Sequence, residues 1–316
     1  MKQGRRAAVL CTAAMALILL LAGNAMAEAV NISYVRAPFN LQMIILREHQ
    51  LLEKHLKPLG IDVSWHEITS GSHQAQALAS GDLDVGGVMN TTSVQLANAE
   101  GNPVQIIAGV ARPTDVFALV AAKGGVASVK DLKGKTVAGS KGTVLHQLLV
   151  AALAKEGMSM QDIQFVQMGT EKAFAALQSR RVDAALLAAN MVIKAQQEGG
   201  RILVTATGLV RPVLVMTASE TFVREHPDRL KAVLAAHDEA GDWMMRHHDE
   251  ALALGAKVQN VSLDDAKKLY DWSHFTQRIN AEDIESMQAD MAFMIENGMM
   301  RNTVDPRTFI QPQAME

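Results

Sequence analysis

Short clusters of hydroxyl, amide and glycine residues recur where an apolar segment of the chain gives way to a helical pattern. Such residues let backbone N–H groups approach an oxyanion closely, and a helix start offers unpaired N–H groups and the positive end of the helix dipole. They predict an anion-binding site. The candidates are Arg36, Phe39, Ser70, Gly71, Ser72, Met89, Asn90, Thr91, Thr92, Lys141, Gly142, Thr143, His146, Thr170, Asn190 and Met191.

Each candidate also has a purely structural interpretation. Ser, Thr and Asn are the usual N-caps of helices, a single cation is most often solvated, and Met commonly fills gaps in a core. The set as a whole favours a ligand, because the clusters fall at matching places in two halves of the chain. Asn90 and Asn190 are the leading pair.

Catalytic and metal-binding patterns have little support in this chain. There is no G-x-S-x-G or H-E-x-x-H motif, and the only cysteine, Cys11, precedes the folded part. His247 and His248 are adjacent on an expected helix, where neighbouring side chains diverge by about 100°. We therefore predict no catalytic residue, no metal and no cofactor.

The elements that would position the clusters alternate between strand and helix. Apolar or alternating segments predict strands at 30–35, 61–68, 83–89 and 104–111, and again at 134–140, 162–168 and 182–188. Helical patterns separate them. This order predicts an α/β fold with mostly parallel sheets covered by helices on both faces.

Part of the first half returns in the second. ALASGDLDVGGV (77–88) resembles ALQSRRVDAALL (176–187) at an offset of 99 residues, and the two preceding strands recur at offsets of 102 and 105. The repeat predicts two similarly wound lobes. Asp84 and Asp183 begin matching strands at the end away from the expected site, so we assign them a structural role.

Two short proline-containing segments predict that the second lobe is inserted into the first. They contain the expected hinge residues Arg112, Pro113, Arg211 and Pro212, whose arginines are also candidates for neutralising a ligand charge. The expected lobes are 28–113 with 210–316, and 114–209. Helices with starts near Asp228, Ser262 and Asn280 are expected to close over the first lobe.

The N-terminus has the pattern of a cleavable secretory signal. Basic residues precede an apolar run over 7–22, and Ala25-Met26-Ala27 predicts cleavage after Ala27. Cleavage removes three basic and no acidic residues, which moves the formal charge from −3 to −6. An acidic chain without a basic run is not expected to bind nucleic acid.

The chain resembles the periplasmic substrate-binding proteins of ABC importers, in the group for nitrate, taurine and aliphatic sulfonates. The resemblance is carried by LLEKHL, TSGSHQAQALASGDLDVGG, VASVKDLKGKTVAGSKGT and AFAALQSRRVDAALL, in that order. It implies a two-lobed, type II fold that closes about a hinge. It also implies a monomer in the periplasm that delivers a small organic anion to a membrane permease and ATPase.

One wall of the expected cleft departs from this family. Many sulfonate and nitrate binders have Trp-Asp/Glu-Pro where this chain has Ala188-Ala189-Asn190-Met191, which predicts a smaller, more apolar wall and a bulkier or less polar ligand. Two alternatives stay open. One is a binder of a pyrimidine or aromatic vitamin precursor, and the other is a biosynthetic enzyme with the same two-lobed fold, which the export signal disfavours.

Overall fold

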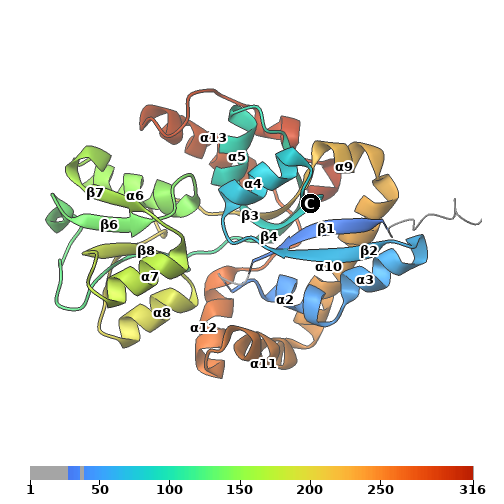
Figure 1. The fold of residues 1–316 in the computed structure, drawn as a ribbon, viewed down its shortest axis with the longest axis horizontal. Coiled ribbons are helices and arrows are strands. Elements are labelled where there is room, and N and C mark those ends of the chain that lie inside the picture. The colour runs from blue at the N-terminus through green and yellow to red at the C-terminus, as the bar shows by residue number, and fades with distance from the viewer. Residues whose placement is uncertain (1–27, 36–38, 316) are drawn as a thin grey trace, which may run out of the picture.

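Two separate five-stranded sheets form the framework of the protein. The computed structural model describes residues 28–35 and 39–315, and each sheet forms the centre of one lobe (Figure 1). The first sheet has the order β2-β1-β3-β10-β4 and the second β7-β6-β8-β5-β9. The strands are β1 (Ala29–Tyr34), β2 (Asp62–Glu67), β3 (Val85–Asn90), β4 (Val104–Ala111), β5 (Phe117–Ala121), β6 (Thr136–Gly139), β7 (Gln164–Gln167), β8 (Ala184–Ala188), β9 (Arg201–Thr205) and β10 (Leu214–Ser219). The predicted two-lobed α/β fold is confirmed.

The two sheets have the same winding, which explains the internal repeat. β1, β2 and β3 are parallel, as are β6, β7 and β8, while β10 and β5 run antiparallel to both of their neighbours. Ile32 pairs with Val85 in one sheet and Val137 pairs with Ala184 in the other. These pairs preserve the sequence offsets of 105 and 99 residues.

Asp84 and Asp183 have equivalent structural roles. The backbone N–H of Asn31 donates to Asp84 Oδ2 at 2.8 Å, and that of Thr136 donates to Asp183 Oδ2 at 2.8 Å. Each carboxylate thereby ties the first strand of its lobe to the third. The structural assignment made from the sequence holds for both residues.

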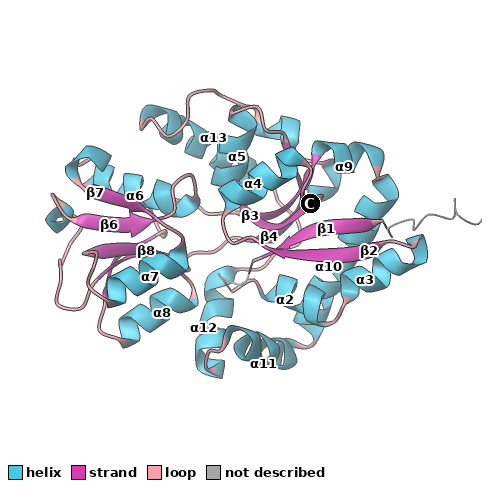
Figure 2. Cartoon of the chain, viewed as in Figure 1, coloured by secondary structure: helices cyan, strands magenta, loops and turns pink. Residues whose placement is uncertain are grey.

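Helices cover both faces of each sheet (Figure 2). In the second lobe α6 packs on one face, and apolar residues of α7 and α8 form a separate cluster on the other. In the first lobe α4 and α5 cover one face, and α2, α3 and α10 the other. The helices are α2 (Leu41–Glu48), α3 (Leu51–Leu56), α4 (Gly71–Ser80), α5 (Thr91–Ala99), α6 (Val144–Lys155), α7 (Thr170–Gln178), α8 (Asn190–Gln197), α9 (Glu220–Glu225), α10 (Pro227–Arg246), α11 (His248–Gln259), α12 (Leu263–Ser273) and α13 (Ala281–Glu296).

Two of the three expected starts of C-terminal helices are confirmed. Ser262 caps α12 by accepting from the backbone N–H of Asp265, and Asn280 caps α13 in a reciprocal capping box with Asp283. Asp228 is not a cap. Because Pro227 suits the first helical position, α10 begins there and Asp228 falls in its first turn.

Residues 112–116 and 206–213 connect the two sheets, and α13 lies against both connections. Arg112 of the first connection pairs with Asp283 of α13 at 2.7 Å, and Arg211 of the second pairs with Glu282 at 2.9 Å. The Asp283 side chain is fully buried. The expected signal segment, 1–27, lies outside the described residues, and within the described part no helix has the length and apolarity needed to cross a bilayer.

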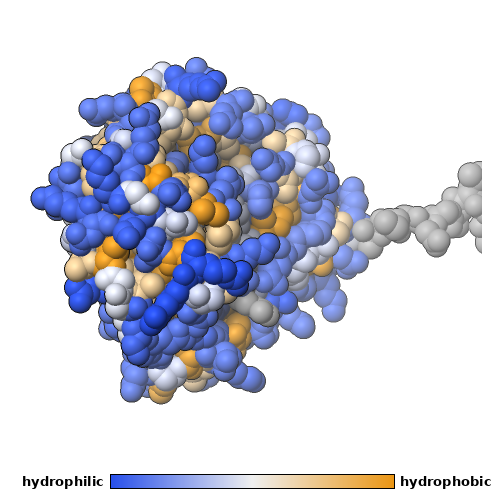
Figure 3. All heavy atoms as spheres, turned by 60° about the vertical axis from the view of Figure 1, so that its left-hand side comes forward, coloured by the Kyte–Doolittle hydropathy of each residue, from blue (hydrophilic) through white to orange (hydrophobic). Residues whose placement is uncertain are grey.

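Hydrophilic residues cover most of the face seen in Figure 3, with apolar residues appearing in small groups between them. The exposed large apolar side chains are scattered over both lobes, at Leu59, Val166, Met245, Leu263 and Ile295. Scattered exposed apolar residues are ordinary for a globular surface. The surface apolar residues thus mark no site, and the candidate sites are the cavities between the lobes.

Candidate functional site

A cleft with a cavity of about 80 Å³ lies between the carboxyl ends of the strands of the two sheets. In open α/β sheets this is where ligands bind. The first lobe contributes Val35, Thr69, Ser70, Gly71, Val88, Met89, Asn90 and Leu214, and the second contributes Phe117, Ser140, Thr143, Val144, Leu145, Gly169, Thr170 and Ala188. Each lobe thus contributes half of the residues that line the cleft.

Four helices begin at this cleft, two from each lobe. Their N-cap residues are Ser70 for α4, Asn90 for α5, Thr143 for α6 and Gly169 for α7, and all four line the cleft. Only α5 among them has a side-chain cap. The N-caps of α4, α6 and α7 make no side-chain cap, and of the three only α6 has its first N–H, that of Val144, bonded to a side chain, Asn90 Oδ1. The cleft therefore presents unpaired donors and four positive dipole ends.

The described cleft lining carries no charged side chain. It consists of apolar, hydroxyl, amide and glycine residues. A bound anion would therefore meet neutral donors, chiefly backbone N–H groups, rather than an ion pair. Helix N-termini bind phosphate, sulfate and carboxylate groups in this way.

Asn90 joins the two lobes at the floor of the cleft. Its Oδ1 accepts from the backbone N–H of Ser93 at 2.9 Å, which caps α5, and from the backbone N–H of Val144 at 3.3 Å in the other lobe. Its Nδ2 donates to no described residue. The amide nitrogen is therefore available to a ligand.

Close packing between α4 and α5 requires a glycine at position 71. A Cβ added to Gly71 would lie 2.7 Å from Ser93 Oγ and 2.9 Å from Ser93 Cβ. A larger residue would push the start of α4 away from α5. Gly71 thus lets the N-termini of α4 and α5 converge at the cleft.

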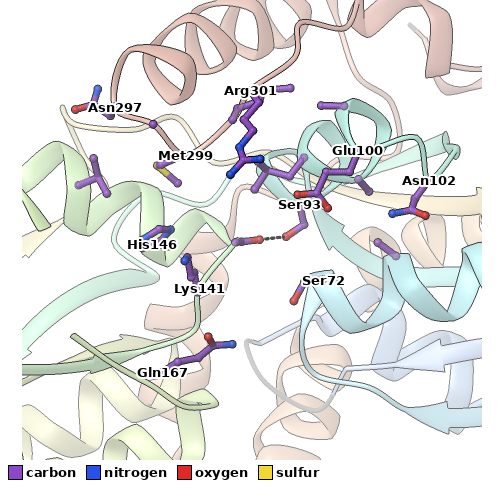
Figure 4. Close-up of a pocket in the computed structure, with 18 of the residues that line it drawn as sticks. Ser72, Ser93, Glu100, Asn102, Lys141, His146, Gln167, Asn297, Met299 and Arg301 are labelled. Atoms are coloured by element: carbon purple, nitrogen blue, oxygen red, sulfur yellow. Dashed lines mark hydrogen bonds between the residues drawn. The ribbon is translucent and has the colours of Figure 1, made fainter.

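The structure does not bring all of the predicted site residues together. Ser70, Gly71, Met89, Asn90, Thr143 and Thr170 line the cleft. Ser72, Lys141, Gly142 and His146 instead line a larger groove of about 1120 Å³, formed between the lobes by α4, α5, α6 and residues 297–302 (Figure 4). Thr91, Thr92 and Phe39 are buried, with Phe39 against Gly255, and Arg36 lies outside the described residues.

Asn190 and Met191 are not among the residues that line the cleft or the groove, unlike Asn90. The offset of 99 residues between the third strands makes Ala189, not Asn190, the counterpart of Asn90. Ala189 has a positive φ of 49° and is the N-cap of α8. This turn places Asn190 in the first turn of α8 and buries Met191 among apolar residues of the second lobe.

The hinge arginines are engaged by α13. Arg112 donates from Nε and Nη2 to the Asp283 carboxylate, at 3.0 and 2.7 Å, and Arg211 donates from Nη2 to Glu282. Neither arginine lines the cleft. Their alternative role of neutralising a ligand charge is therefore not supported, whereas their place on the connections with Pro113 and Pro212 fits a hinge.

His146 is a neutral side chain at the edge of the groove. Burial, and then the positive charge of Lys141, lower the pKa of His146 from 6.5 to about 4. The imidazole lies against the ring of Phe165, with centroids 5.6 Å apart. Near neutral pH it therefore supplies no positive charge to an anion.

Sequence reasoning missed several cleft residues from the ends of strands. Thr69 and Ser140 each stand one residue before a predicted cluster, so extending the clusters by one residue would have included them. Phe117 and Leu214 begin the antiparallel strands that follow the two connections. Their position directly after the two connections between the lobes is the sequence feature that would have predicted them.

The matching family model is described as "NMT1/THI5 like" and covers residues 56–251. The chain belongs to this family. A protein of Escherichia coli (strain K12), whose name gives it as an aliphatic sulfonates-binding protein, is 29% identical over 293 residues, which is 92% of this chain and 91% of that protein. The predicted resemblance is confirmed.

Solved structures share the two-lobed fold. The alkanesulfonate-binding protein SsuA from Xanthomonas axonopodis pv. citri, solved bound to MOPS, has a TM-score of 0.78 at 20% identity and covers 90% of this chain and 98% of its own. The desulfurization enzyme DSZB has a TM-score of 0.66 at 16% identity, covering 90% of this chain and 97% of its own. The fold therefore occurs in both binding proteins and an enzyme.

Proposed function

We propose that this protein is the periplasmic solute-binding component of an ABC importer and captures a small organic anion of the sulfonate or taurine type between its lobes. The observation that carries the proposal is the convergence of four helix N-termini on a cleft without charged side chains in its described lining. The sulfonate-binding relatives support the choice of anion. A membrane permease and its ATPase would receive the ligand from a monomeric binding protein.

The size of the cleft argues for a small ligand. A cavity of about 150 Å³ holds a benzene molecule, whereas this cleft offers about 80 Å³. The Ala188 wall is small and apolar, as expected, but the cavity does not favour the bulkier ligand that we expected with it. Methanesulfonate, which has five non-hydrogen atoms against the six of benzene, is the appropriate first probe, and taurine, with seven, tests a larger ligand.

The chemistry of the cleft favours binding over catalysis. Its described lining has hydroxyl groups, at Thr69, Ser70, Ser140, Thr143 and Thr170, but no His, Asp, Glu, Lys or Cys. A hydroxyl nucleophile needs a neighbouring base to become reactive. These hydroxyls are better suited to donate hydrogen bonds to an oxyanion.

Gly169 offers a direct test of the cleft as the ligand site. A Cβ added there meets no atom within 4 Å, so the backbone accepts a side chain at this position, and Gly169→Leu would add an apolar side chain to the lining of the cleft. We expect methanesulfonate or taurine to raise the melting temperature of the wild-type protein but not that of Gly169→Leu. Lys172→Leu, which places the same side chain at an exposed position of α7, is the control and should bind normally. Equal binding by all three proteins would contradict the assignment of the cleft.

A further inference from the structure

Beside the cleft, one glutamine of the second lobe is held between two residues of the first. Gln147 lies in the first turns of α6 and is buried. Its Oε1 accepts from the hydroxyl of Thr92 on α5 at 2.7 Å, and its Nε2 donates to Asp290 Oδ1 on α13 at 2.7 Å. Both ends of its amide are therefore satisfied by the opposite lobe.

This contact belongs to a group of polar contacts that cross between the lobes. Ser93 Oγ donates to the carbonyl oxygen of Gly142 at 2.9 Å, as the dashed line in Figure 4 shows. The backbone N–H of Val144 donates to Asn90 Oδ1. Unlike these contacts, the contact of Gln147 involves a titratable group, the side-chain carboxyl of Asp290.

We propose that Gln147 is a closure residue, which holds the two lobes together by hydrogen-bonding to Thr92 and Asp290, and that this closure is favoured in acid because it encloses the Asp290 carboxylate. The inference rests on the proposed binding function, and it adds a control of lobe closure by pH. Rotation about the connections at 112–116 and 206–213 would separate α6 from α5 and α13. Separation would return the Asp290 carboxylate to water.

The electrostatics of Asp290 give the direction of the pH effect. Burial raises the pKa of Asp290 from 3.8 to about 6, and the hydrogen bond from Gln147 opposes this increase only in part. In separated lobes the exposed carboxyl group would have its ordinary, lower pKa. Closure therefore takes up a proton: it is favoured most below the ordinary pKa, and the advantage is lost as pH rises through about 6.

No other charge accounts for the shift of the Asp290 pKa, whose causes are burial and the hydrogen bond from Gln147. The titratable groups on the surrounding elements and adjoining loops are Glu100, Lys141, His146, Lys155, Glu282, Asp283, Glu285, Glu296 and Arg301. Glu282 and Asp283 pair with the hinge arginines. His146 packs against Phe165 of its own lobe, and because burial lowers its pKa, any loss of this burial on opening would favour the open form in acid, the direction opposite to that of Asp290. Asp290 is therefore the group expected to favour closure in acid.

The distance between the lobes is the measurement that tests this inference. Spin labels at Lys172→Cys and Asp228→Cys, both exposed positions on opposite lobes, report it by double electron–electron resonance in a Cys11→Ser background. No ligand is needed, so the result stands even if sulfonates do not bind. We expect the short-distance population to increase from pH 7.5 to pH 5 in the wild-type protein.

Charge substitutions separate closure from a merely structural role. Gln147→Glu sets a second carboxylate against Asp290, so we expect it to lose the short-distance population at pH 7.5 and regain it in acid. Asp290→Asn should remove the pH dependence, and Gln147→Glu with Asp290→Asn should restore closure at pH 7.5. Glu285→Gln, which removes an exposed carboxylate from the same helix, is the control and should behave as wild type.

A binding measurement with methanesulfonate provides a second readout. Loss of a charge-assisted hydrogen bond is expected to lower affinity about ten- to a hundredfold in Gln147→Glu at pH 7.5. Thr92→Val, which removes one hydrogen bond and adds no charge, should shift both readouts in the same direction by less. A pH-independent wild-type distance, or a double variant that stays open at pH 7.5, would overturn the inference.

Discussion

Asn90 Oδ1 accepts from the backbone N–H of Ser93 in its own lobe and from that of Val144 in the other lobe. One side-chain oxygen thus caps α5 and contacts the start of α6. Its Nδ2 group remains available at the cleft. Because different atoms of Asn90 cap the helix and face the cleft, substitutions of Asn90 can change anion binding without changing helix capping.

Asn90→Asp is expected to weaken anion binding while preserving the fold. Aspartate caps helices as well as asparagine does, and a negative charge near two helix N-termini is favourable. The same charge repels an anion in the cleft, so affinity for methanesulfonate should fall at least tenfold, or about 1.4 kcal/mol. Calorimetric titration with a parallel thermal melt measures both effects.

Asn90→Ala provides the matched comparison. It loses the cap, at a cost of about 1 kcal/mol of unfolding free energy, and it introduces no repulsion. If the aspartate variant bound methanesulfonate as tightly as wild type, a ligand anion could not lie near Asn90.

The ion pair between Arg112 and Asp283 is expected to stabilise the hinge. Removing one partner of a buried pair leaves an uncompensated charge, and such changes cost about 3 kcal/mol or more. Asp283→Ala should lower the free energy of unfolding, measured with urea, by at least this amount, because it also removes the Asp283 side chain from the capping box at the start of α13. Glu225→Ala, in an exposed pair with Arg224, should leave the unfolding free energy unchanged. Equal stability of the two variants would show that the α13 contact does not support the connections.

His146 should make the fold less stable in mild acid. Its pKa is lowered to about 4 in the folded protein, below the 6.5 of an unfolded chain. As pH falls from 6.5 toward 4, protonation favours the unfolded chain and stability declines. His146→Leu should reduce this decline between pH 7 and pH 5 by about 1 kcal/mol, within the limit of about 1.4 kcal/mol per pH unit for one group. Urea unfolding at both pH values measures it, and parallel pH dependences of the two proteins would contradict it.

The sequence predicted the architecture well because the repeat constrains it. Equivalent segments at nearly constant offsets require equivalent strands, and Asp84 and Asp183 then occupy equivalent hydrogen-bonding positions. Asn280 and Ser262 were predictable because capping depends on local sequence. Asp228 was not a cap, because Pro227 supplies a helix start one residue earlier.

The site was harder to predict, because a one-residue shift changes which side chain meets the ligand. Ala189 has a positive φ, which the sequence does not reveal for an alanine, and it takes the position that we expected for Asn190. Gln147 lies in the apolar segment LHQLLV, where nothing indicates that both of its polar atoms contact the opposite lobe. Such contacts depend on how the lobes meet, and no local pattern encodes that.

The central claim is that neutral donors at converging helix starts select a small anion. Calorimetric titration of the wild-type protein with methanesulfonate and with dimethyl sulfone, its uncharged analogue of similar shape, tests it most directly. We predict that methanesulfonate binds at least tenfold more tightly than the sulfone. Equal affinity for the two, or binding of the sulfone alone, would contradict the account.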